Sequence, residues 1–261
     1  MLFSWLKRRR RKKLVAAPLP EASLGILASN VPQYQSLSAD ERTRFVADLK
    51  IFLGEKYWEG CGGLQLTDEM RVTIAAYACL MTVGLGVEVF DHVLSILVYP
   101  SAFVVPHRHA LGETSLVGEM AVLGEAHHRG PVILSWDEVL RDARQPGSGG
   151  NLVWHEMAHQ LDMLDRAFDG VPPLARREDM GKWREVVTAE YDRLVADTET
   201  GRPTLLDEYG ASDLVEFFAV ATECFFDRPG ALRTRHRDLY QLLAGFYRQD
   251  PAARTDGPAK S

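Results

Sequence analysis

The stretch His155-Glu156-Met157-Ala158-His159 constrains the fold of this chain more than any other feature of its sequence. Side chains four residues apart lie on one face of a helix, so both imidazoles can bind one metal ion at about 2.0–2.1 Å. Glu156 follows the first histidine, where its carboxylate can reach a water molecule on that ion. The H-E-x-x-H pattern is a recognised metalloprotease signature. The motif therefore predicts a helix that holds zinc, and a zinc-dependent hydrolase.

The residues around the motif favour a buried helix. Asn151 is suited to cap its start, and a break at Gly149-Gly150 precedes it. Two histidines and a glutamate inside such a helix require hydrogen bonds or a metal, because unpaired burial is costly. The alternative is a surface helix in which these residues are incidental. Against it stand the apolar residues that surround the motif, namely Leu152, Val153, Trp154, Met157, Ala158 and Leu161.

A third metal ligand is expected from a second apolar segment, residues 212–226, which carries Glu216 and Glu223. The two glutamates are seven residues apart and therefore lie on nearly the same helix face. Glu216 can instead form a capping box with Asp213, three residues before it. Glu223 can instead be a buried carboxylate that pairs with a ligand histidine. The spacing alone leaves both glutamates open as the ligand, with a slight preference for Glu216.

Two segments of the chain, residues 150–162 and 216–226, resemble the active-site segments of the Mlc titration factor A (MtfA) family. Residues 57–64, 130–136 and 247–251 fit the same family, and the resemblance covers roughly residues 20 to 251. It implies a zinc peptidase of the gluzincin type in the cytoplasm, distantly related in its catalytic core to the anthrax lethal factor protease.

The resemblance also implies roles for single residues. Glu216 would complete the metal site with His155 and His159. Tyr209, seven residues before Glu216, would stabilise the oxyanion of the reaction, although without the family it reads as an ordinary half-buried tyrosine. Glu156 would be the general base for a zinc-bound water. Asp162 can orient a ligand imidazole from behind, or it can simply cap the end of the helix, and both interpretations stay open.

The remaining pattern predicts an α+β fold, a mainly helical zincin-type core with a small mixed sheet and the H-E-x-x-H helix at its active site. We expect a single metallopeptidase domain over residues 21–251, with a helical part at about 21–85 and a catalytic part at about 86–251. Predicted helices begin at Ser38 and Thr67, and others cover 180–194 and 239–247. Predicted strands lie at 87–90, 93–99 and 131–136. The last of these is either an edge strand that receives an extended peptide or a buried central strand.

The two ends of the chain are predicted to be tails. Residues 1–20 hold the unbroken basic run Lys7–Lys13, so the net charge of −6 leaves about −13 on the rest of the chain. We expect residues 1–20 to be a flexible, solvated tail, with weak contact to an anionic membrane surface as the alternative. Residues 252–261 are expected to be disordered. The poor apolar run after Lys13 argues against a signal peptide.

Two classes of function are consistent with these features. The first is a peptidase with a peptide or protein substrate, for which an aminopeptidase-like activity fits. The second is a weakly catalytic or non-catalytic zinc protein that sequesters an Mlc-like transcription regulator, as the family name implies. The acidic body argues against direct binding of nucleic acid. The three dispersed cysteines argue against a disulfide framework. Four other histidines are expected at the surface near the cleft, namely His107, His109, His127 and His128.

Overall fold

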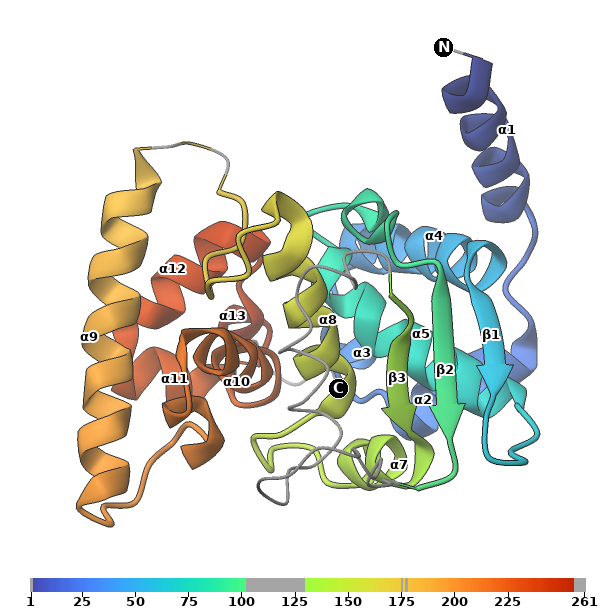
Figure 1. Ribbon diagram of the computed structural model, residues 1–261. Coiled ribbons are helices and arrows are strands. Elements are labelled where there is room, and N and C mark those ends of the chain that lie inside the picture. Colours follow the sequence, from blue (N-terminus) through green and yellow to red (C-terminus); the bar gives the residue numbers. More distant parts are fainter. Residues whose placement is uncertain (1, 102–129, 175, 177, 256–261) are drawn as a thin grey trace, which may run out of the picture.

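The computed structural model describes residues 2–101, 130–174, 176 and 178–255, and Figure 1 shows a helix that carries the metal-binding motif between two groups of elements. The first group joins a small sheet to helices from the N-terminal half of the chain, and the second is a group of C-terminal helices. The first group contains α1 (Leu2–Ala16), α2 (Glu21–Asn30), α3 (Gln33–Ser36), α4 (Ala39–Glu55), β1 (Tyr57–Gly60), α5 (Asp68–Thr82), η1 (Val87–Phe90), β2 (Ser95–Tyr99), β3 (Val132–Ser135) and α7 (Trp136–Arg144). The central helix is α8 (Leu152–Asp162), followed by η3 (Met163–Asp165). The second group contains α9 (Asp179–Glu199), η4 (Glu208–Ala211), α10 (Leu214–Asp227), α11 (Pro229–Arg235), α12 (Arg237–Tyr247) and α13 (Pro251–Thr255).

The sheet has the order β1-β2-β3, and both strand pairs among the described residues are parallel. We expected a small mixed sheet, so the described strands differ from the prediction in their direction. For β1 and β2 the reason lies in the connection between them, because helix α5 carries the chain back before β2 begins. The predicted α+β class with a mainly helical core holds.

The segment Val87–Phe90 forms the 3-10 helix η1 rather than the predicted strand. Its alternating apolar residues fit a strand, but Gly86 turns the chain with a φ of 90° immediately before it. The Lys56 ammonium group then donates hydrogen bonds to the carbonyl oxygens of Phe90 and Val93, at 2.5 and 2.7 Å. Those two carbonyls are satisfied by a side chain instead of by a neighbouring strand.

The helix α8 is packed into the core by contacts with α5 and α10. The ring of Trp154 meets Tyr77 of α5 edge-on at 5.1 Å, and its indole N–H donates to the Tyr77 carbonyl oxygen at 2.9 Å. On its other side the same ring lies 5.4 Å from Phe226 of α10. The apolar residues around the motif are thus buried on two sides, as the sequence predicts.

The N-terminal residues form helix α1 where we expected a flexible tail. Arg11 is buried in the C-terminal half of this helix and forms ion pairs with Glu55 at 2.6 Å, Glu88 at 2.8 Å and Asp91 at 2.5 Å. These carboxylates come from α4, from η1 and from the residue after η1, so they hold the basic run as a helix against the body. In the part of the chain that the structure describes, α1 included, we find no helix with the length and apolarity required to cross a bilayer.

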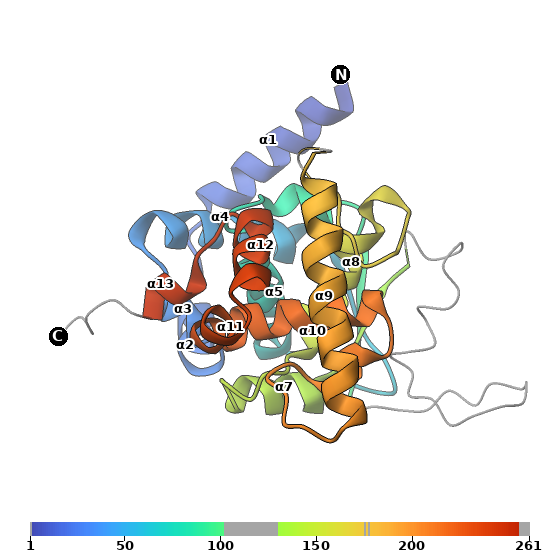
Figure 2. The same ribbon diagram turned by 90° about the vertical axis from the view of Figure 1, so that its left-hand side faces the viewer.

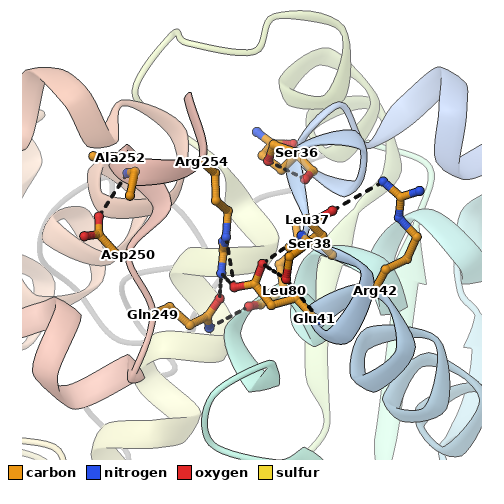
Figure 3. A network of polar contacts seen from close by, with 12 residues as sticks. Ser36, Leu37, Ser38, Glu41, Arg42, Leu80, Gln249, Asp250, Ala252 and Arg254 are labelled. Atoms are coloured by element: carbon orange, nitrogen blue, oxygen red, sulfur yellow. Dashed lines mark hydrogen bonds and ion pairs between the residues drawn. The ribbon is translucent and has the colours of Figure 1, made fainter. Parts of the chain in front are cut away.

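The C-terminal segment is anchored to α4 and α5 through polar contacts that Figure 3 shows from close by. Arg254 of α13 forms an ion pair with Glu41 at 2.6 Å, and the Gln249 amide donates to the Leu80 carbonyl oxygen at 2.9 Å. Glu41 also closes the capping box of α4 with Ser38. The predicted disordered tail is therefore wrong for residues 252–255, which are helical, and its other residues lie outside the described range.

Candidate metal centre

Helix α8 presents both histidines of the motif to one point. The side chain of Asn151 caps the helix by accepting a hydrogen bond from the Trp154 amide at 3.0 Å, as predicted. One turn separates His155 from His159, whose rings lie 4.7 Å apart and nearly perpendicular. Both side chains are buried. The cap and the apolar packing of α8 thus fix the two imidazoles in neighbouring positions.

Helix α10 brings Glu216 to the same point. Asp213 caps α10 by accepting hydrogen bonds from the amides of Val215 and Glu216, at 2.8 and 2.9 Å. The predicted capping interaction of Asp213 therefore exists, but the Glu216 carboxylate turns towards the histidines. Its Oε2 lies 3.0 Å from Nε2 of His155 and 3.5 Å from Nε2 of His159. The two Nε2 atoms are 3.1 Å apart.

This triangle fits a metal ion. Ligands at 2.0–2.1 Å from a tetrahedral ion lie about 3.3–3.4 Å from one another, close to the three distances observed. Oε2 of Glu216 is buried and has no well-directed hydrogen bond, so a cation would satisfy it. Within the described ranges, the set His155, His159 and Glu216 is the one group of three such side chains that could hold an ion.

The charges at the triangle favour a cation there. Burial opposes a charge on His155, but Glu216 and Glu223 outweigh it and raise the pKa of the imidazole to about 10. Burial also opposes the charge of Glu216, yet the two neighbouring imidazoles lower the pKa of its carboxyl group to about 2. The site thus stabilises positive charge between the histidines and a carboxylate, which a metal ion supplies more compactly than a proton.

Glu223 lies behind His155 rather than in the triangle. Its Oε1 is 2.8 Å from Nδ1 of His155, and its Oε2 accepts a hydrogen bond from the Asn151 amide at 2.5 Å. The Nδ1 contact leaves Nε2 of the same ring free to face the metal position. The two glutamates of α10 thus occupy different positions, with Glu216 beside both Nε2 atoms and Glu223 at Nδ1 of His155.

We expect Glu223→Gln to weaken metal binding about 10- to 100-fold, the range typical for loss of a carboxylate behind a ligand histidine. The amide cannot accept from both His155 and the Asn151 N–H, so one contact is lost. Titration with zinc against a competing chelator measures the effect. Asp142→Asn is the matched control, because Asp142 also accepts from the start of α8, at the Leu152 amide at 2.9 Å, without contacting a ligand. Equal weakening in both variants would contradict the orienting role.

Glu156 and Tyr209 lie beside the triangle. Oε1 of Glu156 is buried without a hydrogen bond, and burial raises the pKa of this carboxyl group. Tyr209 is on η4 and is 41% exposed, and its ring lies 6.0 Å from that of His155. Burial of the other part, followed by the charge of Glu216, raises the pKa of the Tyr209 hydroxyl to about 12. The phenol thus remains protonated at neutral pH and can donate a hydrogen bond.

Asp162 is the last residue of α8, in line with the interpretation that it ends the helix. Its Oδ2 accepts a hydrogen bond from the Gly170 amide at 3.0 Å, which ties the loop after η3 back to α8. Its Oδ1 and Nδ1 of His159 both lack a hydrogen bond within the described residues, so no hydrogen bond joins these two atoms. Sequence analysis missed Phe168, whose ring lies 5.9 Å from that of His159. Its φ of 46° belongs to the left-handed region, and no residue pattern announces that conformation.

The other candidate ligands do not join this centre. The described cysteines are all free. His236 pairs with Glu190 at 2.7 Å. The four histidines expected at the surface near the cleft lie outside the described residues, namely His107, His109, His127 and His128.

Comparison with known proteins places this centre in a family. The model of the family described as glucose-regulated metallo-peptidase M90 matches residues 5–248. The chain is 39% identical to the uncharacterised protein slr2042 of Synechocystis over 248 residues, 93% of this chain and 89% of that protein. It is 34% identical to the Mlc titration factor A of Pectobacterium atrosepticum over 87% of this chain and 86% of that protein. For the Mlc titration factor A of Yersinia pestis, the identity is again 34%, over 87% and 84%.

These matches span nearly the whole described chain, and they include both helices that supply the buried His, His and Glu side chains. The family is one of metallopeptidases, and two histidines and a glutamate are side chains that bind metal ions. The chain therefore belongs to the Mlc titration factor A family of metallopeptidases, the glucose-regulated metallo-peptidase M90 family.

Proposed function

We propose that this chain is a zinc-dependent peptidase of the gluzincin type, with His155, His159 and Glu216 as the zinc ligands. The observation that carries the proposal is the 3.0–3.5 Å triangle of two imidazole nitrogens and one carboxylate oxygen, with Glu156 beside it. Two nitrogens and one oxygen are a common donor set for catalytic zinc, which keeps its fourth position open. A cytoplasmic location is part of the proposal.

Bound zinc would act as a Lewis acid and lower the pKa of a coordinated water to about 7. The proton transfers of the reaction are made by a side chain of the protein. Glu156 takes the proton from the attacking water and delivers it to the nitrogen of the leaving amine. Its lack of a hydrogen-bond partner leaves Oε1 available for this transfer. Glu223 keeps the His155 ring in place during the reaction through the Nδ1 contact.

We expect Tyr209→Phe to lower kcat about 10²- to 10³-fold, with a much smaller change in KM. The phenol would donate a hydrogen bond to the oxygen on which negative charge develops, and phenylalanine keeps the ring but removes this donor. Steady-state kinetics on a peptide substrate measure the loss. Tyr191→Phe is the control, because the Tyr191 hydroxyl donates to the Ala211 carbonyl oxygen at the end of η4 instead of facing the triangle. A kcat in Tyr209→Phe that equals that of the control would contradict the role.

Strand β3 is the surface on which we propose that the substrate binds. Among the described strands it pairs with β2 alone, so its other edge has no strand partner there. An extended peptide can add to such an edge through main-chain hydrogen bonds. Helix α8 packs against β3, which brings the edge near the metal ligands. This supports the edge-strand alternative from the sequence over the buried central strand.

The second candidate function is capture of a transcription regulator. The observation that favours it is the name of two relatives, Mlc titration factor A. If capture is the function, the chain binds an Mlc-like repressor as a protein partner and hydrolyses peptides weakly or not at all. Direct contact with nucleic acid forms no part of either proposal.

Cleavage assays separate the two functions. Zinc-loaded protein is incubated with aminoacyl anilides, which report aminopeptidase-like activity, and with internally quenched peptides, which report internal cleavage. Hydrolysis that a chelator removes and zinc restores supports the peptidase. No hydrolysis of any substrate, together with stable binding of an Mlc-like repressor, would reject the peptidase in favour of the capture function.

A further inference from the structure

The N-terminal helix α1 is attached to the body along one face. Arg11 forms its three ion pairs there, the Arg10 guanidinium donates to the Gly54 carbonyl oxygen at 2.8 Å, and Lys7 pairs with Asp91 at 2.6 Å. Gly54 has no side chain, so Leu14 packs directly on its backbone. Figures 1 and 2 both show the N-terminal end of α1 projecting beyond the remaining elements. The C-terminal half of the helix is therefore held against the body, while its N-terminal end projects from the protein.

The opposite face of α1 is exposed and has an unusual composition. Successive residues of a helix are rotated by about 100°, which places Leu6, Arg9 and Lys13 roughly opposite Arg11, with Trp5 and Lys12 on the adjoining side. Trp5 is 52% exposed and Leu6 is 48% exposed. The Arg9 guanidinium lies over the Trp5 ring at 5.4 Å. We call this surface the outward face, and it consists of Trp5, Leu6, Arg9, Lys12 and Lys13, all of them exposed.

We propose that the outward face docks on the anionic surface of a lipid membrane. Its cations match anionic headgroups, and Trp5 and Leu6 can insert at the boundary between headgroups and acyl chains, where tryptophan is favoured. The apolar tip distinguishes this partner from nucleic acid, which would use the cations alone. The rest of the chain carries about −13 and is repelled by such a surface, so contact is confined to α1.

The attachment of α1 gives this docking a direction. A flexible basic tail would tether the protein loosely. The ion pairs of Arg11 instead hold the helix against the body, and the body lies on the side away from the outward face. The helix is too short and too polar to span the bilayer, so it lies on the membrane surface. The protein would thus bind the membrane in one orientation.

Sedimentation with vesicles tests the proposal on the full chain. Wild type is expected to bind vesicles of phosphatidylcholine mixed with phosphatidylglycerol, and to bind neither pure phosphatidylcholine nor the mixture at high salt. A basic residue near an anionic surface strengthens binding about fivefold, so Lys12→Gln with Lys13→Gln should weaken it about 25-fold. Trp5→Ala with Leu6→Ala should weaken it by about tenfold or more. The matched control is Lys182→Gln with Arg184→Gln, which removes the same charge from exposed positions of α9.

Two further measurements, fluorescence quenching by lipids and binding of nucleic acid, complete the test. Lipids brominated on the acyl chains should quench Trp5, and Trp5→Phe should remove this quenching while it keeps most of the binding. The proposal is overturned if wild type fails to bind the anionic vesicles, or if the outward-face variants bind as tightly as the α9 control. It is also overturned if α1 binds random-sequence DNA through the same cations and leaves vesicles unbound. Unchanged thermal unfolding of each variant shows that its fold is intact, and none of these measurements depends on peptidase activity.

Discussion

Glu156→Gln is expected to lower the kcat for peptide hydrolysis by about 10²- to 10⁴-fold, the range for loss of a general base. Glutamine has nearly the shape of glutamate, but its amide cannot take a proton from water near neutral pH. The three proposed zinc ligands stay unchanged, so the metal content should equal that of wild type. Kinetic assays with metal analysis of the same preparation measure both quantities.

A second isosteric change provides the control for this result. Asp142→Asn also exchanges a partly buried carboxylate for an amide next to α8, and it should keep most of the activity. Full activity in Glu156→Gln would remove the proposed mechanism. Loss of activity together with loss of zinc would instead show that the variant disturbs the ligands, and the mechanism would then need a different test.

Glu216→Ala is expected to release the metal. It removes one of three ligands, so its effect on zinc affinity should exceed the 10- to 100-fold loss expected from Glu223→Gln. Without a carboxylate at this position, two adjacent imidazoles remain, and zinc sites of proteins generally need a third protein ligand. Metal analysis after dialysis against a weak chelator measures the loss, and peptide hydrolysis should disappear with it.

Glu223→Ala is the variant to compare, because it lies on the same helix and the same face. Zinc retained in Glu216→Ala and lost in Glu223→Ala would reverse the assignment of the two glutamates. The same experiment examines the family resemblance, which assigns the ligand role to Glu216.

The local parts of the site could be predicted because neighbours in the sequence determine them. The Asn151 cap, the Ser38 and Glu41 capping box and the shared face of the two histidines all depend on contacts within four residues. The choice between Glu216 and Glu223 could not be made in this way. Both fit one helix face, and only the packing of α10 against α8 determines which carboxylate meets Nε2 and which meets Nδ1 of His155.

The errors in the fold share a cause, which is contact between distant parts of the chain. The basic run becomes a helix because Arg11 meets carboxylates 44, 77 and 80 residues away. Residues 87–90 turn from a predicted strand into η1 beside the Lys56 ammonium group, more than thirty residues earlier in the sequence. The parallel direction of β1 and β2 likewise depends on where α5 returns the chain. A pattern read within one segment contains none of this information.

The three ion pairs of Arg11 affect how a shortened form of this protein would depend on pH. A chain that starts after Ala16 would leave Glu55, Glu88 and Asp91 without the guanidinium that joins them. Burial opposes the charge of Asp91, but the hydrogen bonds from Lys7 and Arg11 outweigh it and hold the pKa of this carboxyl group below its usual value. A lowered carboxyl pKa stabilises the fold above the pKa of the unfolded chain, and this stability is lost as pH falls through the folded pKa. Removing the first helix would therefore cost stability at neutral pH and leave the stability in strong acid unchanged.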